Sequence, residues 1–248
     1  MRRSRSDGQI TMQTAGEVLD DARDFVRSQI GALLRRLPDQ RPVVRIKLTR
    51  SARSALPWSV LVQANLETRG QLLRGQVAGA FFHEAAQLLR RSLAQRLPTL
   101  AGRPAWRDAR PSVPVVGVSG RREIVRRKYC TPARCMPEQA ALTMDLMDYD
   151  IHLFVDAETG EDSAVYRIGP TGYRLARLVS TAPPSGPVSV PLTVNVHEVP
   201  LLTPEEAVGR LDATELPFRF FRNADTDRGS VLYRRYDGHY GLVTPTAR

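Results

Sequence analysis

The first hundred residues switch between the two periods by which strands and helices distribute their apolar side chains. Four short segments alternate, or run apolar between polar turns, as strands do: QITMQT (9–14), VVRIKLT (43–49), WSVLVQANL (58–66) and QLLRGQV (71–77). Two longer segments, from Val18 to Leu37 and from Ala80 to Leu97, carry an apolar stripe of helical period beside a charged face. The order β-α-β-β-β-α predicts an α+β domain over residues 1–100, with two helices on one face of a four-stranded sheet.

The second half of the chain carries the same small module twice, at a constant offset of 67 residues. Each copy opens with a proline at a helix start and continues through a short helix, an apolar strand, a polar turn and a second strand that ends in a tyrosine-containing turn. Equivalent residues include Pro137 and Pro204, Glu138 and Glu205, Asp145 and Asp212, Tyr166 and Tyr233, and Tyr173 and Tyr240. The period predicts two tandem α+β repeats, each a helix with a β-hairpin or three strands, over residues 125–180 and 192–248.

Two segments without a sustained period separate these parts of the chain. Residues 101–124 and residues 181–191 are rich in proline and glycine, which disfavour both helix and strand. Both segments are predicted to be linkers, the first of them extended.

Each repeat is too small to cover both faces of its strands by itself. The apolar positions predicted to need a partner are Ile151, Leu153, Val155, Phe218, Phe220 and Phe221. Because both copies carry such a strand, we expect the two repeats to pair with each other.

Positive charge is concentrated in the N-terminal part of the chain. Residues 1–110 hold 20 Arg and Lys against 9 Asp and Glu, whereas residues 111–248 hold 16 against 17. A general preference for arginine would explain the choice of Arg over Lys, but not this segregation. A polyanion is therefore the expected partner of the N-terminal domain.

The candidate contacts to that polyanion are basic residues on the charged faces of the two predicted helices and on the strand that follows the first helix. They are Arg23, Arg27, Arg35, Arg36, Arg45, Lys47, Arg90, Arg91 and Arg96. Guanidinium groups bind phosphates without reading the base sequence. The predicted sheet has few aromatic residues, so a folded, phosphate-rich RNA is favoured over stacked single strands.

No pattern for catalysis or metal binding stands out along the chain. The four histidines are scattered, and no HExxH, GxSxG, Walker or GxGxxG motif is present. Cys130 and Cys135 are too few for a tetrahedral zinc site, and the acidic stretch 156–162 has the composition of a hairpin turn rather than of a calcium loop. We therefore predict a protein that is not an enzyme and has no cofactor and no metal.

The expected compartment is the cytoplasm. No apolar run reaches the length that spans a bilayer, and the basic start MRRSRS is not followed by the apolar segment of a secretory signal. Two cysteines without partners also suit a reducing compartment.

The two repeats resemble the C-terminal domain of long ribosome hibernation promoting factors. That family's pattern runs from a Ser/Thr-Pro-Glu-Glu-Ala helix start through a Phe-rich strand and an Asn-Ala-Glu-Thr-Gly turn to Tyr-Arg-Arg-x-Asp-Gly-x-Tyr-Gly-Leu. TPEEA, LPFRFFRNADTDRG and YRRYDGHYGL in the second copy match it almost throughout, and MPEQA and FVDAETGEDSAVYR match it in the first. The N-terminal domain resembles the family in its element order and in RDFV and LRRSL.

The resemblance implies a protein that binds the small ribosomal subunit in the channel for mRNA and tRNA, contacts 16S rRNA, inhibits translation and protects idle ribosomes under stress or in dormancy. It implies the rRNA-binding role for the helix arginines, with Arg91 the closest positional match. In the family, the C-terminal domain forms homodimers that join two 70S ribosomes into a 100S particle. High arginine content and MDYDIHLFVDAETGED also resemble actinobacterial, dormancy-associated members.

This chain departs from the family pattern by having two repeats, and by His152 and Asp156 where Phe and Asn are usual. Tandem repeats meet at an effective concentration near millimolar, so we predict that they pair within the chain and leave 70S monomers. The alternatives are a factor that still forms 100S dimers through a homodimer, and a nucleic-acid-binding transcriptional regulator with a dimerising tail.

Overall fold

The computed structural model describes residues 9–37, 42–51, 59–101, 120–169, 172–214 and 216–246. It divides into two compact units: Met1–Ala105 with Asp145–Asp148, and Trp106–Met144 with Tyr149–Arg248. No helix in the described ranges is long and apolar enough to cross a membrane. The basic start of the chain, the first residue of the predicted strand 58–66 and most of the linker 101–124 lie outside the described residues.

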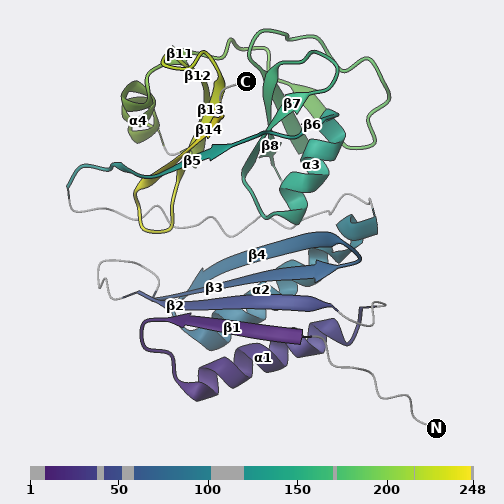
Figure 1. The fold of residues 1–248 in the computed structure, drawn as a ribbon, viewed down its shortest axis with the longest axis vertical. Coiled ribbons are helices and arrows are strands. Elements are labelled where there is room, and N and C mark those ends of the chain that lie inside the picture. The colour runs from purple at the N-terminus through teal and green to yellow at the C-terminus, as the bar shows by residue number, and fades with distance from the viewer. Residues whose placement is uncertain are drawn as a thin grey trace. The chain divides into compact units, whose positions relative to one another are not determined.

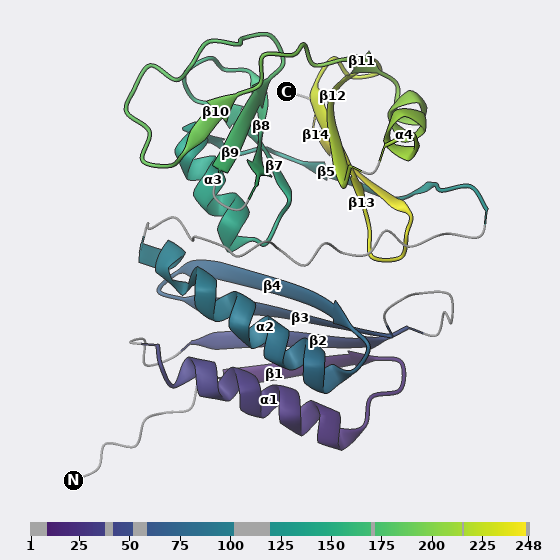
Figure 2. The ribbon, with the colours of Figure 1, turned by 180° about the vertical axis from the view of Figure 1, so that it is seen from behind.

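The N-terminal domain is a four-stranded sheet with two helices on one face, the predicted α+β arrangement (Figures 1 and 2). Its elements are β1 (Gln9–Ala15), α1 (Asp20–Leu34), β2 (Val43–Arg50), β3 (Val60–Thr68), β4 (Gln71–Gly79), α2 (Phe82–Arg96) and the 3-10 helix η1 (Leu97–Ala101). The strand order is β1-β2-β3-β4, with β1 parallel to β2 and the other pairs antiparallel.

Alternation along the strands decides which side chains of this domain enter the core. The apolar residues that point to the helices, with the helix stripes that cover them, include Val44, Ile46, Leu48, Val62, Ala64, Leu66, Val26, Ile30, Leu89 and Leu93, and all are nearly inaccessible to solvent. Removing this apolar area from water stabilises the domain. The intervening positions, such as Arg45 and Lys47, point to the opposite face of the sheet and are exposed.

Each repeat is a short helix with a sheet, and equivalent residues fill equivalent positions in the two copies. The first repeat contains β6 (Arg134–Cys135), α3 (Pro137–Leu146), β7 (Ile151–Asp156), β8 (Asp162–Ile168) and β9 (Gly172–Arg177). The second contains β11 (Leu201–Leu202), α4 (Pro204–Asp212), β12 (Phe218–Asn223), β13 (Gly229–Arg234) and β14 (Tyr240–Pro245). Phe154 and Tyr173 in the first core correspond to Phe221 and Tyr240 in the second.

The start of α4 shows why these residues form a helix. Thr203 accepts a hydrogen bond from the backbone N–H of Glu206 through its hydroxyl, and the Glu206 carboxylate accepts one from the backbone N–H of Thr203. Pro204 at the first helical position has no N–H to leave unsatisfied.

Two further strands complete the sheets, and each crosses from one repeat to the other. β5 (Ile124–Cys130), at the start of the first repeat, pairs in parallel with β14 of the second. β10 (Leu192–Val194), at the start of the second repeat, pairs in parallel with β9 of the first. The offset of 67 residues makes β5 and β10 equivalents, so the exchange is reciprocal. The resulting sheets have the orders β10-β9-β8-β7-β6 and β11-β12-β13-β14-β5.

Candidate nucleic-acid interface and repeat contact

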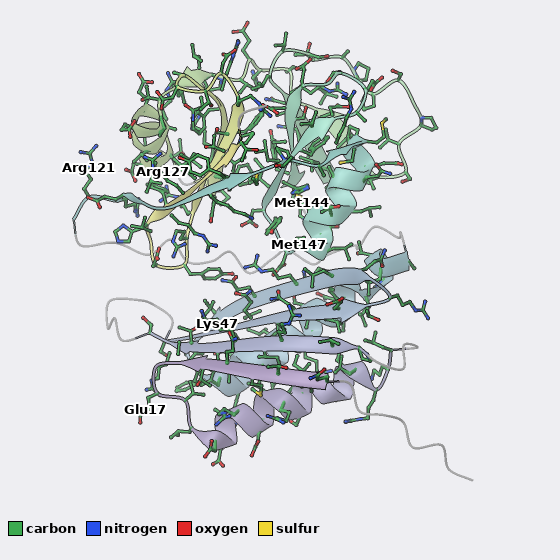
Figure 3. All side chains as sticks on the ribbon, viewed as in Figure 1. Glu17, Lys47, Arg121, Arg127, Met144 and Met147 are labelled. Atoms are coloured by element: carbon green, nitrogen blue, oxygen red, sulfur yellow. The ribbon has the colours of Figure 1, made fainter. Side chains whose placement is uncertain are left out.

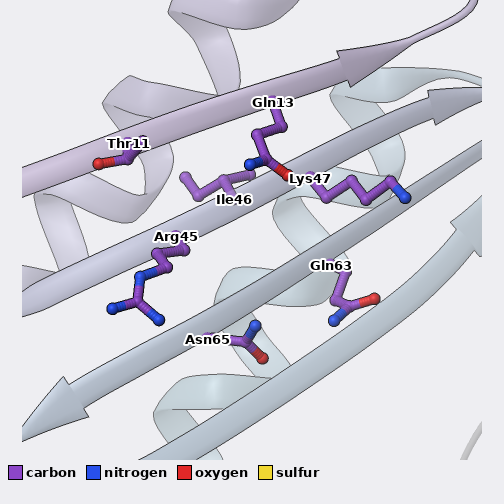
Figure 4. Close-up of a pocket in the computed structure, with 7 residues that line it drawn as sticks. All are labelled: Thr11, Gln13, Arg45, Ile46, Lys47, Gln63 and Asn65. Carbon is purple, nitrogen blue, oxygen red and sulfur yellow. The ribbon is translucent and has the colours of Figure 1, made fainter.

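The open face of the N-terminal sheet carries two rows of polar side chains (Figure 4). Strand register aligns Thr11 of β1 with Arg45 of β2 and Asn65 of β3 in one row. The second row aligns Gln13, Lys47 and Gln63. Together they line a shallow depression of about 180 Å³.

This face combines two exposed cations with neutral groups that both donate and accept hydrogen bonds. Arg45 and Lys47 can contact phosphate oxygens, the first through two parallel N–H groups and the second as a point charge. The amides of Gln13, Gln63 and Asn65 can bind either donors or acceptors on a base edge or a ribose. None of the lining residues is aromatic, so the depression offers polar contacts and no stacking platform.

The predicted helix arginines lie on the other side of the domain. Arg27, Arg35, Arg36 and Arg91 are exposed on α1, just beyond it and on α2, which cover the face opposite to Arg45 and Lys47. Arg23 and Arg90 are partly buried, and Nη1 of Arg23 lies 3.0 Å from the Asp20 carboxylate. The structure thus distributes the candidate residues over two faces of the domain.

Arg96 was predicted to project from the helix into solvent, but its side chain is buried. Its Nε donates to the Ser92 carbonyl at 3.1 Å, and its Nη1 donates to the Arg74 carbonyl on β4 at 2.5 Å. The end of α2 lies over β4, where Gly75 leaves room: a Cβ there would approach the Arg96 Nη2 to 3.1 Å. Since Arg96 satisfies backbone carbonyls of its own domain, its outward orientation was a wrong prediction.

The helices α3 and α4 cover the outer faces of the repeat sheets, and the inner faces meet each other (Figures 1 and 2). Leu153 on β7, Ala164 on β8 and Val231 on β13 are buried although they belong to neither helix-side core. The rings of Tyr166 and Phe218 meet edge to face at 5.3 Å across this contact.

Phe221 was predicted to lie in the contact between the repeats, but the structure places it elsewhere. It is fully buried in the core under α4, while its neighbour Phe220 lies on the opposite face. Successive strand residues point to opposite faces, so Phe220 and Phe221 cannot both face the other repeat. Ile151, Leu153 and Val155 share the inner face with Phe218 and Phe220 by the same alternation.

Asp156 and His152, the two residues that depart from the family pattern, are both shielded from solvent to a large extent. Asp156 lies fully buried 2.7 Å from Nε of Arg177, so an acid at this position has a cation beside it. The equivalents in the second repeat are the neutral Asn223 and Thr244. Burial, with a smaller effect of Lys128, lowers the pKa of His152 to about 4, so this side chain is neutral at physiological pH.

The basic strand β5 is not among the predicted contacts, because the average charge of the second half of the chain conceals it. Residues 121–134 hold six Arg and Lys against one Glu, while residues 135–248 hold 10 against 16. Arg126, Arg127 and Lys128 are exposed on β5, and Figure 3 labels Arg127 on the strand and Arg121 just before it. A local charge count over RREIVRRKY would have revealed this segment.

Among the described residues, no three His, Cys, Asp or Glu side chains gather in a way that could hold a metal ion. Cys130 and Cys135 are both free thiols, and burial raises the pKa of each. The described residues thus present exposed cations and a contact between the repeats, and no assembled ligand set for a metal.

Known proteins resemble this chain over most of its length. The family described as "Sigma 54 modulation/S30EA ribosomal protein C terminus" matches residues 120–175 and 193–242, which are the two repeats. The "Dormancy associated translation inhibitor" of Mycobacterium tuberculosis is 42% identical over 216 residues, covering 82% of this chain and 76% of the relative, in each of two strains.

Solved structures resemble a smaller part of the chain. A ribosomal subunit interface protein from Coxiella burnetii is 17% identical with a TM-score of 0.31, covering 38% of this chain and 99% of that chain. The N-terminal domain of Protein Y from Thermus thermophilus is 17% identical with a TM-score of 0.29, covering 35% and 91%. From the two matched repeats and the identity to the mycobacterial relative, the chain belongs to the long-form ribosome hibernation promoting factor family, the sigma 54 modulation/S30EA ribosomal proteins.

Proposed function

We propose that this protein is a ribosome hibernation factor that inhibits translation and stabilises idle ribosomes in the cytoplasm during stress or dormancy. The observation that carries the proposal is the 42% identity to a dormancy-associated translation inhibitor over 82% of the chain. The role requires binding and occlusion, and no covalent step. The protein therefore acts without catalysis and without a cofactor.

The N-terminal domain is the part that binds 16S rRNA in the mRNA and tRNA channel of the small subunit. Its support is the excess of positive charge in this half of the chain and the position of exposed cations on both faces of the domain. A groove lined by rRNA presents phosphates on more than one side, and a domain with basic residues on two faces can contact both walls. Arg96 is left out of this surface because its guanidinium is engaged within the domain.

The repeats pair within one chain, which leaves ribosomes as inactive 70S monomers. The reciprocal exchange of β5 and β10 supports this part of the proposal, because each repeat's sheet is completed by the first strand of the other. A repeat already paired on its inner face has no such face left for a second protein molecule. Linkage on one chain also favours this pairing over pairing between chains.

Co-sedimentation with purified small subunits tests the rRNA-binding surface. Arg45→Glu/Lys47→Glu on the open sheet face and Arg35→Glu/Arg36→Glu on the helix side are each expected to lower affinity by at least about tenfold at moderate salt. The matched control is Arg210→Glu/Arg222→Glu, which makes the same charge change in the second repeat. Equal losses in all three variants would point to net charge alone and contradict the proposed surface.

Sucrose-gradient sedimentation of 70S ribosomes with the wild-type protein tests the pairing. The expected result is a 70S peak that carries the protein. A 100S peak would instead favour a factor that still joins ribosomes. Retention on random duplex DNA with the same affinity as on small subunits would favour the transcriptional regulator.

A further inference from the structure

The two repeats meet at a point where each contributes the same position of the module. Asp162 begins β8 and Gly229 begins β13, and the offset of 67 residues makes them equivalents. The backbone N–H of Gly229 donates to the Asp162 carboxylate at 2.9 Å. When equivalent residues of two copies touch, the contact lies on the local two-fold axis that relates the copies. At this axis the two copies carry different residues, an aspartate in the first repeat and a glycine in the second.

The neighbouring position completes an ion pair between the repeats. Nε and Nη2 of Arg228 donate to the two oxygens of Asp162 at 2.6 and 2.8 Å. The Asp162 side chain is only 2% exposed and that of Arg228 only 16%. The equivalent of Arg228 in the first repeat is Glu161, so the cation stands in one copy and an anion in the other.

The two repeats also differ in the size of the side chain at the axis. A Cβ on Gly229 would lie 2.8 Å from the Cβ of Asp162 and 3.0 Å from the ring of Phe220. The second repeat therefore has no room for a side chain opposite Asp162. The glycine supplies both the space and the N–H group that the carboxylate binds.

Pairing of identical repeats would lose each of these complementarities. Two first repeats would bring Asp162 against Asp162, flanked by a Glu161 from each copy, with no cation at the axis. Two second repeats would bring Arg228 and Gly229 together with their equivalents, with no carboxylate to accept their hydrogen bonds. Like charges that are removed from water strongly disfavour both arrangements.

We infer that Asp162, Arg228 and Gly229 form a pairing code that admits only a first repeat with a second repeat. The inference deepens the proposed intramolecular pairing and rests on it for its functional meaning. The partner that fits this surface is one unlike repeat, from the same chain or from another copy of the chain. Homotypic pairing of the kind that joins two single-repeat proteins is strongly disfavoured by charge.

Thermal unfolding and light-scattering mass of the full-length protein test the code. Arg228→Asp places two carboxylates at the axis and is expected to lower Tm by about 10 °C. The charge exchange Asp162→Arg/Arg228→Asp is expected to recover at least half of that loss. The matched control is Arg222→Asp, which removes an exposed pair within the second repeat and is expected to shift Tm by no more than ~2 °C.

A mixing experiment distinguishes a code from simple loss of stability. The Asp162→Arg chain carries two arginines at the axis and the Arg228→Asp chain carries two aspartates, so neither can pair its own repeats well. Mixed in equal amounts, the two chains complement each other at both contacts, and a complex of twice the monomer mass is expected only in that mixture. Asp162→Arg mixed with Arg222→Asp is the control, and no complex is expected.

The inference is overturned if Arg228→Asp behaves like Arg222→Asp, or if neither the charge exchange nor the mixture recovers pairing. Co-sedimentation of the same variants with ribosomes separates this result from the proposed function, because the changes lie outside the N-terminal domain. If even the wild-type protein fails to bind ribosomes, the proposed function falls while the unfolding and mixing results still decide the pairing code.

Discussion

The N-terminal sheet and the two repeat sheets differ in the residues on the face that their helices leave uncovered. Each has helices on one face. The N-terminal sheet leaves its other face to Arg45, Lys47 and Gln63, whereas the repeats turn Leu153 and Phe220 toward each other. The difference lies in the residues that point away from the helices. Outward polar residues keep a surface available for a ligand, and outward apolar residues commit it to another sheet.

The largest expected effect comes from comparing substitutions on the two faces of one strand, β12. Phe221→Ala empties the core under α4, where the ring is fully buried, and should destabilise the repeat unit by about 3–5 kcal/mol. Phe218→Ala removes one edge-to-face contact on the partly exposed inner face and should cost about 1–2 kcal/mol. Chemical denaturation of the full-length variants measures both. Equal losses would contradict the assignment of the two side chains to different faces.

The second prediction compares the buried ion pair of the first repeat, Asp156 with Arg177, with the neutral residues at the equivalent positions of the second repeat. Asp156→Ala removes the close partner of the Arg177 guanidinium, which is only 1% exposed, and leaves only the Glu158 carboxylate, at 3.6 Å, as an ion-pair partner, so it should cost about 3 kcal/mol. Asp156→Asn/Arg177→Thr copies the neutral pair of the second repeat and should cost less than ~1.5 kcal/mol, because neither ion is then left unpaired. Thermal unfolding of the two variants provides the measurement. A double variant as unstable as Asp156→Ala would show that the first repeat depends on the charges themselves.

The contrast between the sheets was largely predictable from sequence because it rests on alternation. Applied to β2, the period of two places Val44 and Ile46 inward and Arg45 and Lys47 on the other face, and this is the arrangement in the structure. The same rule, applied strictly, would have excluded Phe221 from the inner face. That prediction is wrong because the run Phe218 to Phe221 contributes to two opposite faces of the strand and does not form one apolar surface.

Other features depend on contacts that no local pattern contains. The exchange of β5 and β10 is determined by which edge each strand meets after folding, and neither segment differs from an ordinary extended linker in its period. The inward turn of Arg96 depends on Gly75, 21 residues away in sequence and on another element. Buried ion pairs such as Asp156 with Arg177 likewise join residues that are distant in sequence.

The third prediction concerns the open face of the N-terminal sheet and its sensitivity to salt. If Arg45 and Lys47 each neutralise a phosphate, Arg45→Ala/Lys47→Ala should reduce the slope of log affinity against log salt concentration by about 2. Phe218→Ala, on the face that is committed to the other repeat, should leave the slope unchanged. Binding to small subunits across a range of potassium concentrations checks this. An unchanged slope in the double alanine variant would remove the open face from the interface.

The smallest expected effect concerns the attachment of the crossing strand β5. Asp212 at the end of α4 accepts hydrogen bonds from Nη1 of Arg122, just before β5, at 3.0 Å and from the Tyr240 hydroxyl at 2.5 Å. Burial acts to raise the pKa of Asp212, but these hydrogen bonds and the Arg122 charge outweigh it and lower the pKa below its ordinary value. A lowered carboxyl pKa stabilises the folded state above the unfolded pKa of about 4, and this stabilisation is lost as pH falls through the folded pKa.

The Asp212 side chain is 36% exposed, so solvent screening should hold the effect below about 1 kcal/mol. Asp212→Asn should therefore be slightly less stable than wild type at pH 7, and the difference should shrink below pH ~4 as the wild-type carboxyl protonates. Denaturant unfolding at pH 7 and pH 3 measures it, with Asp225→Asn, in the turn between β12 and β13, as the control. A difference that stayed constant across this range would mean that Asp212 acts through packing rather than through its charge, and that the crossing strand is held by its pairing with β14 alone.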